Sequence, residues 1–384
     1  MKIALVHKRL DLKGGTERDL FRTAEGLRDL GHEVHLFCSE YGVALPRGIT
    51  AHGVPVVPLG RTARLWSFAL RAPEVIKQAG CDVVLSFGRM FDQDVLRCGG
   101  GTHRGFLKRL GEGGGTHRRL WQAISVYHRS LLALEKRQYD SHRLKKIIAV
   151  SDEVKRDIVA NYAIAADRIV VLYNGVDRQR FHPKRRNEFR NAVRERWKIP
   201  LDAPLVLFVG SGFRRKGLDR LVPLWNLPKL ARVYLLVVGS DARVGRYRAW
   251  ADAIAPGRIV FAGRQDEIES YYGAADVVAL PALQEAFGNV VLEALASALP
   301  VLVSRDVGAA EVLSGSLACG IVDRPDNFQE LAAKLLTLLE NAKDAALGQE
   351  ARRIGEEYSW DRHFRNLETV LLEARGAPST FRVC

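Results

Sequence analysis

Short apolar runs rich in β-branched residues alternate with helical patterns along almost the whole chain. Continuous apolar runs bounded by turn residues are typical of strands that are buried on both faces of a parallel sheet. The alternation therefore predicts an α/β fold with two parallel sheets covered by helices. The runs are residues 3–6, 34–38, 83–87, 147–150 and 169–172 in the first half, and 205–209, 233–238, 259–262, 277–280 and 300–303 in the second.

The chain has 384 residues, which is more than one compact core usually holds. A charged segment, residues 181–202, contains Pro183 and Pro200 and precedes the second set of runs. We interpret it as a linker, with a short helix as an option. The predicted domains are residues 1–180 and 181–358. Apolar residues at helical spacing in residues 358–375 predict a final helix.

The segment PALQEAFGNVVLE sets Glu285 and Glu293 eight residues apart around the start of a predicted helix. Free amides at a helix start suit a phosphate, and carboxylates suit hydroxyl groups, so a sugar nucleotide would fit both. Glutamates also favour a helix start when no ligand is present, and spacing alone leaves both interpretations open. The candidate ligand-binding residues here are Glu285, Ala286, Phe287, Gly288, Asn289, Val290 and Glu293.

A second phosphate site is predicted directly after the run 205–209, in GSGFRRKGLD. Gly210 opens a turn in which Arg215 and Lys216 precede a helix, so that two cations and helix amides converge on one spot. A solvated loop would also explain these consecutive charges. The position at the carboxyl end of a strand, where open α/β folds bind ligands, favours the phosphate site.

A third glycine turn, Gly14-Gly15, lies between the first run and a predicted helix. Its backbone could approach a diphosphate closely, although an isolated pair is at least as often a turn that needs positive φ. A nicotinamide dinucleotide is a poor fit for this loop. Glu40 stands where an acidic ribose ligand would be, but KGGTERD lacks the three-glycine spacing of such sites.

The PALQEAFGNVVLE segment resembles the E-x7-E signature of the retaining glycosyltransferases of family 4, which have the GT-B fold. The resemblance implies two facing Rossmann-like domains with a cleft between them, and a C-terminal segment, residues 359–384, that crosses back to the first domain. The sequence YSWDRHF, residues 358–364, is similar to the start of the family's final helix. The loop GSGFRRKGLDR is similar to that of the lipopolysaccharide core glucosyltransferases within the family.

The resemblance also implies roles for single residues. The Arg215-Lys216 pair would hold the donor's diphosphate, the loop of Gly14 and Gly15 would face the reacting sugar, and Glu285 and Glu293 would hold sugar and ribose hydroxyls. His103, in RCGGGTHRGFL, resembles a family histidine near the donor sugar, although a lone histidine is more often structural. Asp19, in GGTERD, resembles an acceptor-side residue, although an acid in a first helical turn is favourable anyway. The implied catalytic residues are Asp19, His103, Arg215, Lys216 and Glu285.

The implied reaction transfers a hexose from a nucleotide-diphosphate sugar to a saccharide with retention. The nucleotide sugar is a co-substrate, so no cofactor is expected. The subgroup resemblance favours UDP-glucose as donor and a heptose of the lipopolysaccharide inner core as acceptor, with another lipid-linked or soluble glycan as the alternative. Asp92-Gln93-Asp94 has the spacing of a metal-binding DxD but lies outside the phosphate loops, which favours a surface turn or helix cap and no metal.

The net charge of +14 is concentrated in two segments. Residues 104–146 hold eleven basic and three acidic residues, and residues 184–198 hold seven and two. The first segment interleaves cations with apolar residues, which suits an anionic membrane surface or a phosphorylated lipid, with a solvated basic face as the alternative. A nucleic-acid-binding protein is the competing class for such a charge, but nucleic acid is not expected as a partner, because no reading motif accompanies the charge.

No apolar run in the sequence approaches the length of a membrane span, and the opening residues enter a predicted strand instead of a secretory signal. The five cysteines are scattered without paired spacing, which is typical of free thiols in a reducing compartment. We therefore expect a cytoplasmic protein attached peripherally to the inner face of the cytoplasmic membrane.

Overall fold

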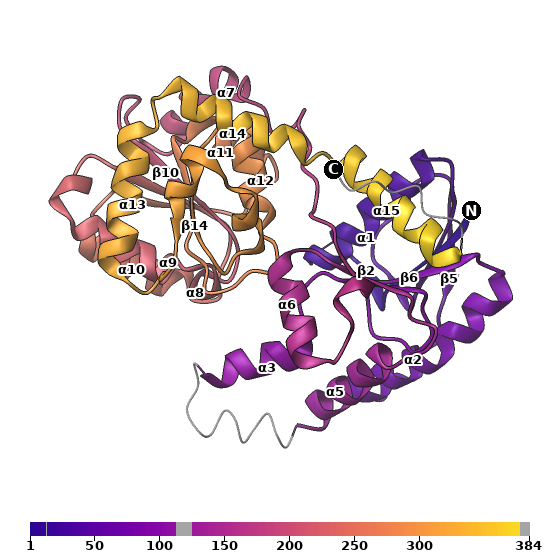
Figure 1. Cartoon of the computed structure of the whole chain (residues 1–384). Helices are drawn as coiled ribbons and strands as arrows, with labels where there is room; N and C mark the ends of the chain where they lie inside the picture. The colour runs from indigo at the N-terminus through magenta and orange to yellow at the C-terminus, as the bar shows by residue number, and fades with distance from the viewer. Residues whose placement is uncertain (13, 113–124, 377–384) are drawn as a thin grey trace. The chain divides into compact units, whose positions relative to one another are not determined.

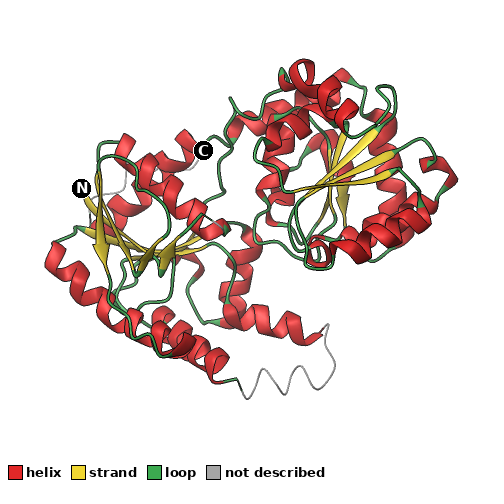
Figure 2. Cartoon of the chain, turned by 180° about the vertical axis from the view of Figure 1, so that it is seen from behind, coloured by secondary structure: helices red, strands yellow, loops and turns green. Residues whose placement is uncertain are grey.

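The computed structural model describes residues 1–12, 14–112 and 125–376. Contacts divide the chain into two compact units, Met1–Tyr173 with Asp361–Cys384 and Asn174–Trp360. Each unit holds a parallel sheet as a layer between helices (Figures 1 and 2). The two parallel sheets that the alternating runs predict are confirmed.

The sheet of the first unit has the strand order β5-β3-β1-β6-β7-β8-β9. A short parallel ribbon of β2 and β4 extends it beyond the ends of β1 and β3. The elements of this unit are β1 (Lys2–Val6), β2 (Arg9–Leu10), α1 (Gly15–Asp29), β3 (Glu33–Cys38), β4 (Glu40–Tyr41), β5 (Ile49–Gly53), α2 (Gly60–Ala79), β6 (Val83–Ser86), β7 (Val95–Cys98), α3 (His103–Glu112), α5 (Val126–Tyr139), β8 (Lys146–Ala149), α6 (Asp152–Asn161), a 3-10 turn (Ala166–Arg168), β9 (Ile169–Val171) and α15 (Trp360–Arg375).

Successive residues of β1 contribute to two different cores. Ile3 and Leu5 belong to a cluster with α1 and α15, whereas Ala4 and Val6 belong to a cluster with α2. Side chains alternate between the two faces of a strand, so the two clusters lie on opposite faces of the sheet. A strand that is apolar at every position is therefore covered by helices on both sides.

The C-terminal helix α15 packs on the first unit, as the resemblance implies. It runs beside α1 in Figure 1, and its residues Leu367 and Leu371 are fully buried in the α1 cluster. A Cβ at Gly26 of α1 would collide with the ring of Phe364, so the glycine allows the two helices to approach closely. The chain passes between the two units once after Tyr173 and again before Asp361. These two connecting segments are hydrogen-bonded to each other, because the amide of Val176 donates to the carbonyl of Tyr358 at 2.8 Å.

The sheet of the second unit has the strand order β12-β11-β10-β13-β14-β15. Its helices and strands are α7 (Arg185–Arg196), β10 (Leu205–Val209), α8 (Phe213–Lys216), α9 (Leu218–Leu221), β11 (Tyr234–Val238), α10 (Val244–Ile254), β12 (Ile259–Gly263), α11 (Ile268–Ala274), β13 (Val277–Leu280), α12 (Asn289–Ala296), β14 (Val301–Ser304), β15 (Ile321–Val322), α13 (Phe328–Asn341) and α14 (Ala345–Glu357), with 3-10 turns at Val222–Asn226, Pro228–Leu230, Gly308–Val312 and Gly315–Gly320.

All ten predicted runs form strands, but β5 and β7 were missed, as were the two-residue strands β2, β4 and β15. The sequence of β5, ITAHG, mixes apolar and polar residues, and none of its positions is buried, because the strand lies at the edge of its sheet. The sequence of β7, VLRC, contains Arg97, whose side chain is fully buried against Asp19. A charge inside a buried strand breaks the apolar pattern on which the prediction depends.

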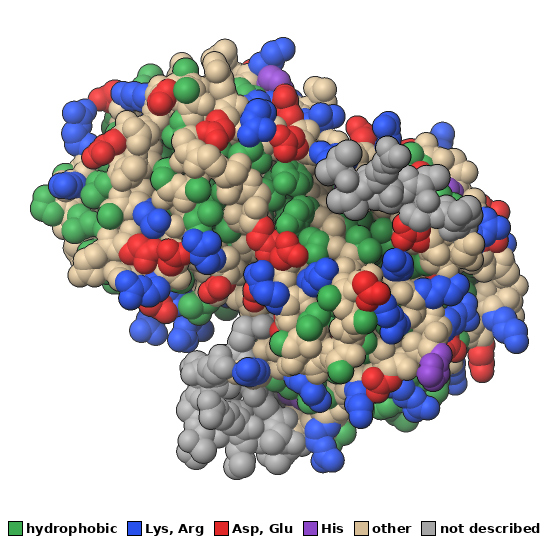
Figure 3. Space-filling model, in the orientation of Figure 1, with side chains coloured by type: hydrophobic (Ala, Val, Ile, Leu, Met, Phe, Trp, Pro, Cys, Tyr) green, Lys and Arg blue, Asp and Glu red, His purple; other side chains and the backbone are tan. Residues whose placement is uncertain are grey.

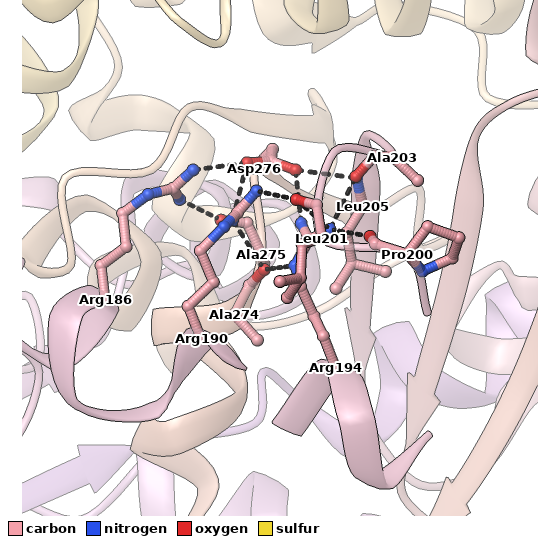
Figure 4. A network of polar contacts seen from close by, with 10 residues as sticks. All are labelled: Arg186, Arg190, Arg194, Pro200, Leu201, Ala203, Leu205, Ala274, Ala275 and Asp276. Atoms are coloured by element: carbon pink, nitrogen blue, oxygen red, sulfur yellow. Dashed lines mark hydrogen bonds and ion pairs between the residues drawn. The ribbon is translucent and has the colours of Figure 1, made fainter. Parts of the chain in front are cut away.

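The segment 181–202 is not a free linker. Its helix α7 is fixed to the second unit by three arginines, one helical turn apart, that converge on Asp276 at the start of β13 (Figure 4). Arg194 is fully buried and also donates to the carbonyls of Ala203 and Ala274, at 2.7 and 3.1 Å. Burial lowers the pKa of Arg194 to about 10, and the charge of Asp276 opposes part of that shift.

We expect Asp276→Ala to lower the free energy of unfolding by about 3–5 kcal/mol, because it leaves a buried guanidinium without its counter-charge. Urea denaturation of the purified protein measures this loss. The matched control is Arg186→Ala, whose side chain is 43% exposed and contacts the same carboxylate. Exposed pairs contribute about 0–1 kcal/mol, so equal losses in the two variants would contradict the interpretation.

Candidate functional site

The basic turn after β10 lies against the loop that follows β13. Gly217, which ends α8, has φ +84°, and a Cβ there would collide with the carbonyl oxygen of Pro281. The amide of Leu283 donates to the carbonyl of Arg215 at 3.3 Å. Two segments about seventy residues apart in the sequence are thus joined through their backbones at the carboxyl ends of neighbouring strands.

Glu285 forms ion pairs with both cations of the basic turn. One carboxylate oxygen, Oε2, lies 2.7 Å from Nζ of Lys216 and also pairs with the guanidinium of Arg215. Lys216 is 9% exposed, whereas the side chain of Arg215 is 57% exposed. Burial would raise the pKa of Glu285, but the charges of Lys216 and Arg215 outweigh it and lower that pKa. Burial lowers the pKa of Lys216, and Glu285 opposes this shift.

The loop of Glu285 is held in place from the opposite side by the turn after β14. The amide of Gly308 donates to the carbonyl of Glu285 at 3.0 Å, and the amide of Ala309 donates to the carbonyl of Phe287 at 2.7 Å. The side chain of Phe287 is buried, so this residue can offer a ligand only its backbone. Gly288 then starts α12 at φ +91°, a conformation that favours glycine.

The first two turns of α12 carry Asn289, Val290 and Glu293. The first amides of a helix have no acceptor within the helix, which makes this end suited to an anion. The side-chain amide of Asn174 donates to the side-chain oxygen of Asn289 at 2.8 Å. Glu293 accepts a hydrogen bond of 2.6 Å from the hydroxyl of Tyr272, a buried residue of α11. The sequence interpretation missed Tyr272, since nothing in its local pattern indicates a contact with Glu293.

In the first unit, Gly14 caps the start of α1 and Gly15 is its first residue. The carboxylate of Glu17 folds back under this turn, so closely that a Cβ at Gly14 would collide with it. Contact with His7, whose Nε2 lies 3.7 Å away, lowers the pKa of Glu17 to about 2. The sequence did not predict that His7 and Glu17 contact this loop. The carboxylate of Glu17 already lies against Gly14, the residue proposed to approach a diphosphate.

Asp19 lies in the second turn of α1 and forms an ion pair with Arg97 of β7, whose Nη2 donates at 3.1 Å. The side chain of Arg97 is fully buried and that of Asp19 is 14% exposed. The pair explains an acid at this position better than the helix dipole does. Its role toward an acceptor stays a prediction.

His103 is the first residue of α3, and its ring stacks with those of Phe106 and His128. Its Nε2 lies 3.1 Å from Nδ1 of His128. Burial lowers the pKa of His103 to about 4, so the imidazole is neutral at pH 7. The sequence interpretation missed His128 as its neighbour, because the two residues lie on different helices.

The Asp92-Gln93-Asp94 segment is part of the scaffold. Asp94 is buried and its Oδ2 accepts the amide of Val84 at 2.9 Å, while Gln93 is fully buried. Gln93 and Asp94 are therefore not part of a surface turn or a helix cap, although Asp92 is exposed. Within residues 1–12, 14–112 and 125–376, no three His, Cys, Asp or Glu side chains are grouped so that they could hold a metal ion.

The two basic segments differ in how their charge is used. Arg186, Arg190 and Arg194 of the second segment are engaged by Asp276, so it is not a free basic face. In the first segment, Phe106 and Val126 are 47% and 66% exposed. Lys and Arg side chains are spread over the face seen in Figure 3, with Asp and Glu among them. Some residues of these expectations lie outside the residues whose side chains the structure describes. They are four apolar residues of the first basic segment, Leu110, Leu120, Trp121 and Ile124, and one of the five cysteines, Cys384.

None of the helices in the described ranges is both long enough and apolar enough to cross a membrane.

The structure brings Arg215, Lys216 and Glu285 together in the second unit, with Gly210 before them in the same turn. Glu293 follows on the helix that this loop starts. The remaining predicted residues, Gly14, Gly15, Asp19 and His103, belong to the first unit. The second unit therefore contains a cationic turn, a helix N-terminus and two carboxylates, the combination that a sugar nucleotide requires.

Two family models match this chain. One, described as "Glycosyltransferase Family 4", matches residues 13–180, and the other, described as "Glycosyl transferases group 1", matches residues 189–354. The lipopolysaccharide glucosyltransferase WaaG of Escherichia coli (strain K12) is 27% identical over 84% of this chain and 86% of its own length.

Solved structures share the fold over nearly the whole chain. A crystal structure of WaaG matches with a TM-score of 0.78 and 23% identity, covering 96% of this chain and 99% of that one. Anabaena Alr3699/HepE in complex with UDP-glucose matches with a TM-score of 0.69 and 19% identity, covering 97% and 100%. Both likenesses support an architecture of two Rossmann-like domains.

Proposed function

Because this chain belongs to glycosyltransferase family 4 and has the GT-B fold of its retaining enzymes, we propose that it transfers glucose from UDP-glucose to a heptose of the lipopolysaccharide inner core. The observation that carries the donor side is the placement of Arg215, Lys216 and Glu285 on one spot beside the N-terminus of α12. Glucose as the sugar and lipopolysaccharide as the acceptor class are supported by the name of WaaG, and UDP-glucose by the HepE complex. The heptose rests on the subgroup resemblance of the loop GSGFRRKGLDR.

In this proposal, negative charge grows on the diphosphate as the glycosidic bond breaks. Arg215, Lys216 and the first amides of α12 stabilise that charge, since they are fixed before the reaction begins. Lys216 matters most, because it is buried and its charge is little screened by water. Glu285 exchanges its ion pairs for the hydroxyl groups of the sugar. Glu293, oriented by Tyr272, accepts from the ribose hydroxyls.

A thermal-shift panel of nucleotide sugars tests the donor. A ligand that binds only the folded state raises the melting temperature, and UDP-glucose should raise it more than UDP, GDP-mannose or UDP-N-acetylglucosamine do. Incubation of the best donor with heptose-containing core saccharide should then give a glycosylated product. A product formed only on another lipid-linked or soluble glycan would keep the family chemistry and replace the acceptor. Binding of nucleic acid without any nucleotide-sugar response would remove the proposal.

We expect transfer activity to survive excess EDTA. Arg215, Lys216 and the helix end already supply the positive charge that a divalent ion would bring to the diphosphate. Initial rates with and without the chelator measure this. Loss of activity with EDTA and its recovery with Mg²⁺ would contradict the prediction.

We also propose peripheral attachment to the inner face of the cytoplasmic membrane through residues 104–146. Phe106 and Val126 are exposed, and so are Arg104 and Arg129, which lie two and three residues from them in the sequence. A surface that combines exposed apolar and basic residues binds anionic lipid through both kinds of contact. Phe106→Ser with Val126→Ser should weaken cosedimentation with anionic vesicles at low salt. Leu201→Ser is the matched control, because Leu201 is a 54% exposed residue outside this segment. Binding that ignores salt, or equal losses in both variants, would count against attachment here.

A further inference from the structure

A buried carboxylate lies behind the residue that starts α3. Glu135, on α5, is fully buried, and the amide of His103 donates to its Oε1 at 2.7 Å. The amide of Arg104 donates to Oε2 at 3.1 Å. The side chain of Glu135 therefore caps two adjacent amides at the N-terminus of α3, although Glu135 itself lies on α5. A negative charge is favourable at the N-terminus of a helix.

Glu135 is itself held by two further groups. Arg89 forms an ion pair with Oε1, and the hydroxyl of Tyr162 donates to Oε2 at 2.5 Å. A buried carboxylate with a guanidinium and three other donors is fully hydrogen-bonded and has little freedom to move. The position of His103 is thereby tied to α5 and α6, not only to its own loop.

A second buried carboxylate supports the same loop one residue earlier. Asp157 of α6 accepts the amide of Thr102 at 2.6 Å, and Oγ1 of Thr102 accepts the amide of Gly105 at 2.9 Å. The amides of residues 102–105 are therefore all used within the protein. This helix end is occupied by the protein's own carboxylates, so that what the loop offers a ligand is the ring of His103.

The ring of His103 is neutral at pH 7, because burial lowers its pKa to about 4, and its Nε2 lies 3.1 Å from Nδ1 of His128. A neutral imidazole can accept from or donate to a hydroxyl group, depending on which nitrogen carries the proton. The usefulness of such a contact depends on placement, because small displacements of a contacting group are costly in rate.

We propose that Glu135 is a positioning residue for the reaction, which fixes the backbone of His103 so that the imidazole meets the donor sugar in a preset place. The proposal rests on the proposed function and on the contact with the donor sugar that the family resemblance implies for His103. It assigns Glu135 no contact with substrate. Its effect on turnover must therefore pass through His103.

The test is a double-mutant cycle with Glu135→Gln and His103→Ala, measured as kcat and KM for the donor. We expect Glu135→Gln to lower kcat about 10-fold with little change in KM, and His103→Ala to lower it by about 10- to 100-fold. The double variant should be no slower than His103→Ala alone, because Glu135 acts only through the imidazole that His103→Ala has already removed. Losses that multiply in the double variant would overturn the proposal.

Two further variants separate positioning from folding. Asp157→Asn removes a second buried charge, which supports the same loop through the amide of Thr102 and does not contact His103. This variant should lower the melting temperature. Any loss of kcat that it causes should multiply with the loss caused by His103→Ala. Tyr162→Phe removes one partner of Glu135 and keeps the charge, and it replaces Glu135→Gln in the cycle if that variant does not fold. Full activity of His103→Ala would overturn this proposal, because Glu135 would then have no reacting group to position, but it would leave the proposed donor site of Arg215, Lys216 and Glu285 standing.

Discussion

Lys216→Met is expected to lower kcat/KM for the nucleotide sugar by about 100- to 1000-fold, the loss that follows removal of one fixed donor to a developing anion. The substitution keeps most of the apolar length of the side chain and removes its charge. Lys216 is 9% exposed and lies 2.7 Å from Glu285, so water cannot replace the missing cation at the diphosphate. Initial rates over a range of donor concentrations give the ratio.

The neighbouring Arg214 provides the control for Lys216. Arg214 is exposed and belongs to the same four-residue helix, α8, but Glu285 pairs with Arg215 and Lys216. Arg214→Met should change kcat/KM by less than about threefold, since an exposed charge is screened by solvent. Equal losses in the two variants would mean that the general charge of the turn matters, and not its placement. An active Lys216→Met enzyme would remove the electrostatic basis of the proposed function.

Glu285→Gln should have opposite effects on binding and on turnover. In the structure the carboxylate neutralises both cations that the diphosphate needs, and the pKa of Glu285 is lowered because those cations favour the ionised form. Removing its charge should strengthen the binding of free UDP about 10-fold, which is about 1.4 kcal/mol. It should lower kcat by about 10- to 100-fold, because a charged hydrogen bond to the sugar is lost.

Isothermal titration with UDP and initial-rate kinetics measure the two effects of Glu285→Gln separately. Glu293→Gln is the comparison, because Glu293 accepts a hydrogen bond from Tyr272, whereas Glu285 forms the ion pairs with Arg215 and Lys216. That variant should weaken the binding of UDP as well as of the donor. If Glu285→Gln weakened UDP binding too, the exchange of ion pairs for hydroxyl groups would be wrong.

The sequence alone predicted the ten main strands, the two parallel sheets and the positions of the two turns in the second unit that we propose bind phosphate. These features are encoded locally. A run such as residues 205–209 is apolar at every position because both of its faces are buried. The turns contain Gly217 and Gly288 because the backbone there has a positive φ, which glycine adopts most easily. The resemblance to family 4 depends on the same short segments, which is why the family assignment agrees with the comparisons.

Only the tertiary structure determined which charged groups meet. Asp19 with Arg97, Glu135 with His103, and Glu293 with Tyr272 are pairs from different elements, and no local pattern links their members. The three arginines of α7 likewise lie in a segment that the sequence predicted to be a linker, and only the fold shows that they meet at Asp276. Apolar patterning specifies which face of an element is buried, whereas a buried ion pair depends on how two elements pack. The chain's sequence thus determined its architecture, and packing decided which of its charges are available to a substrate.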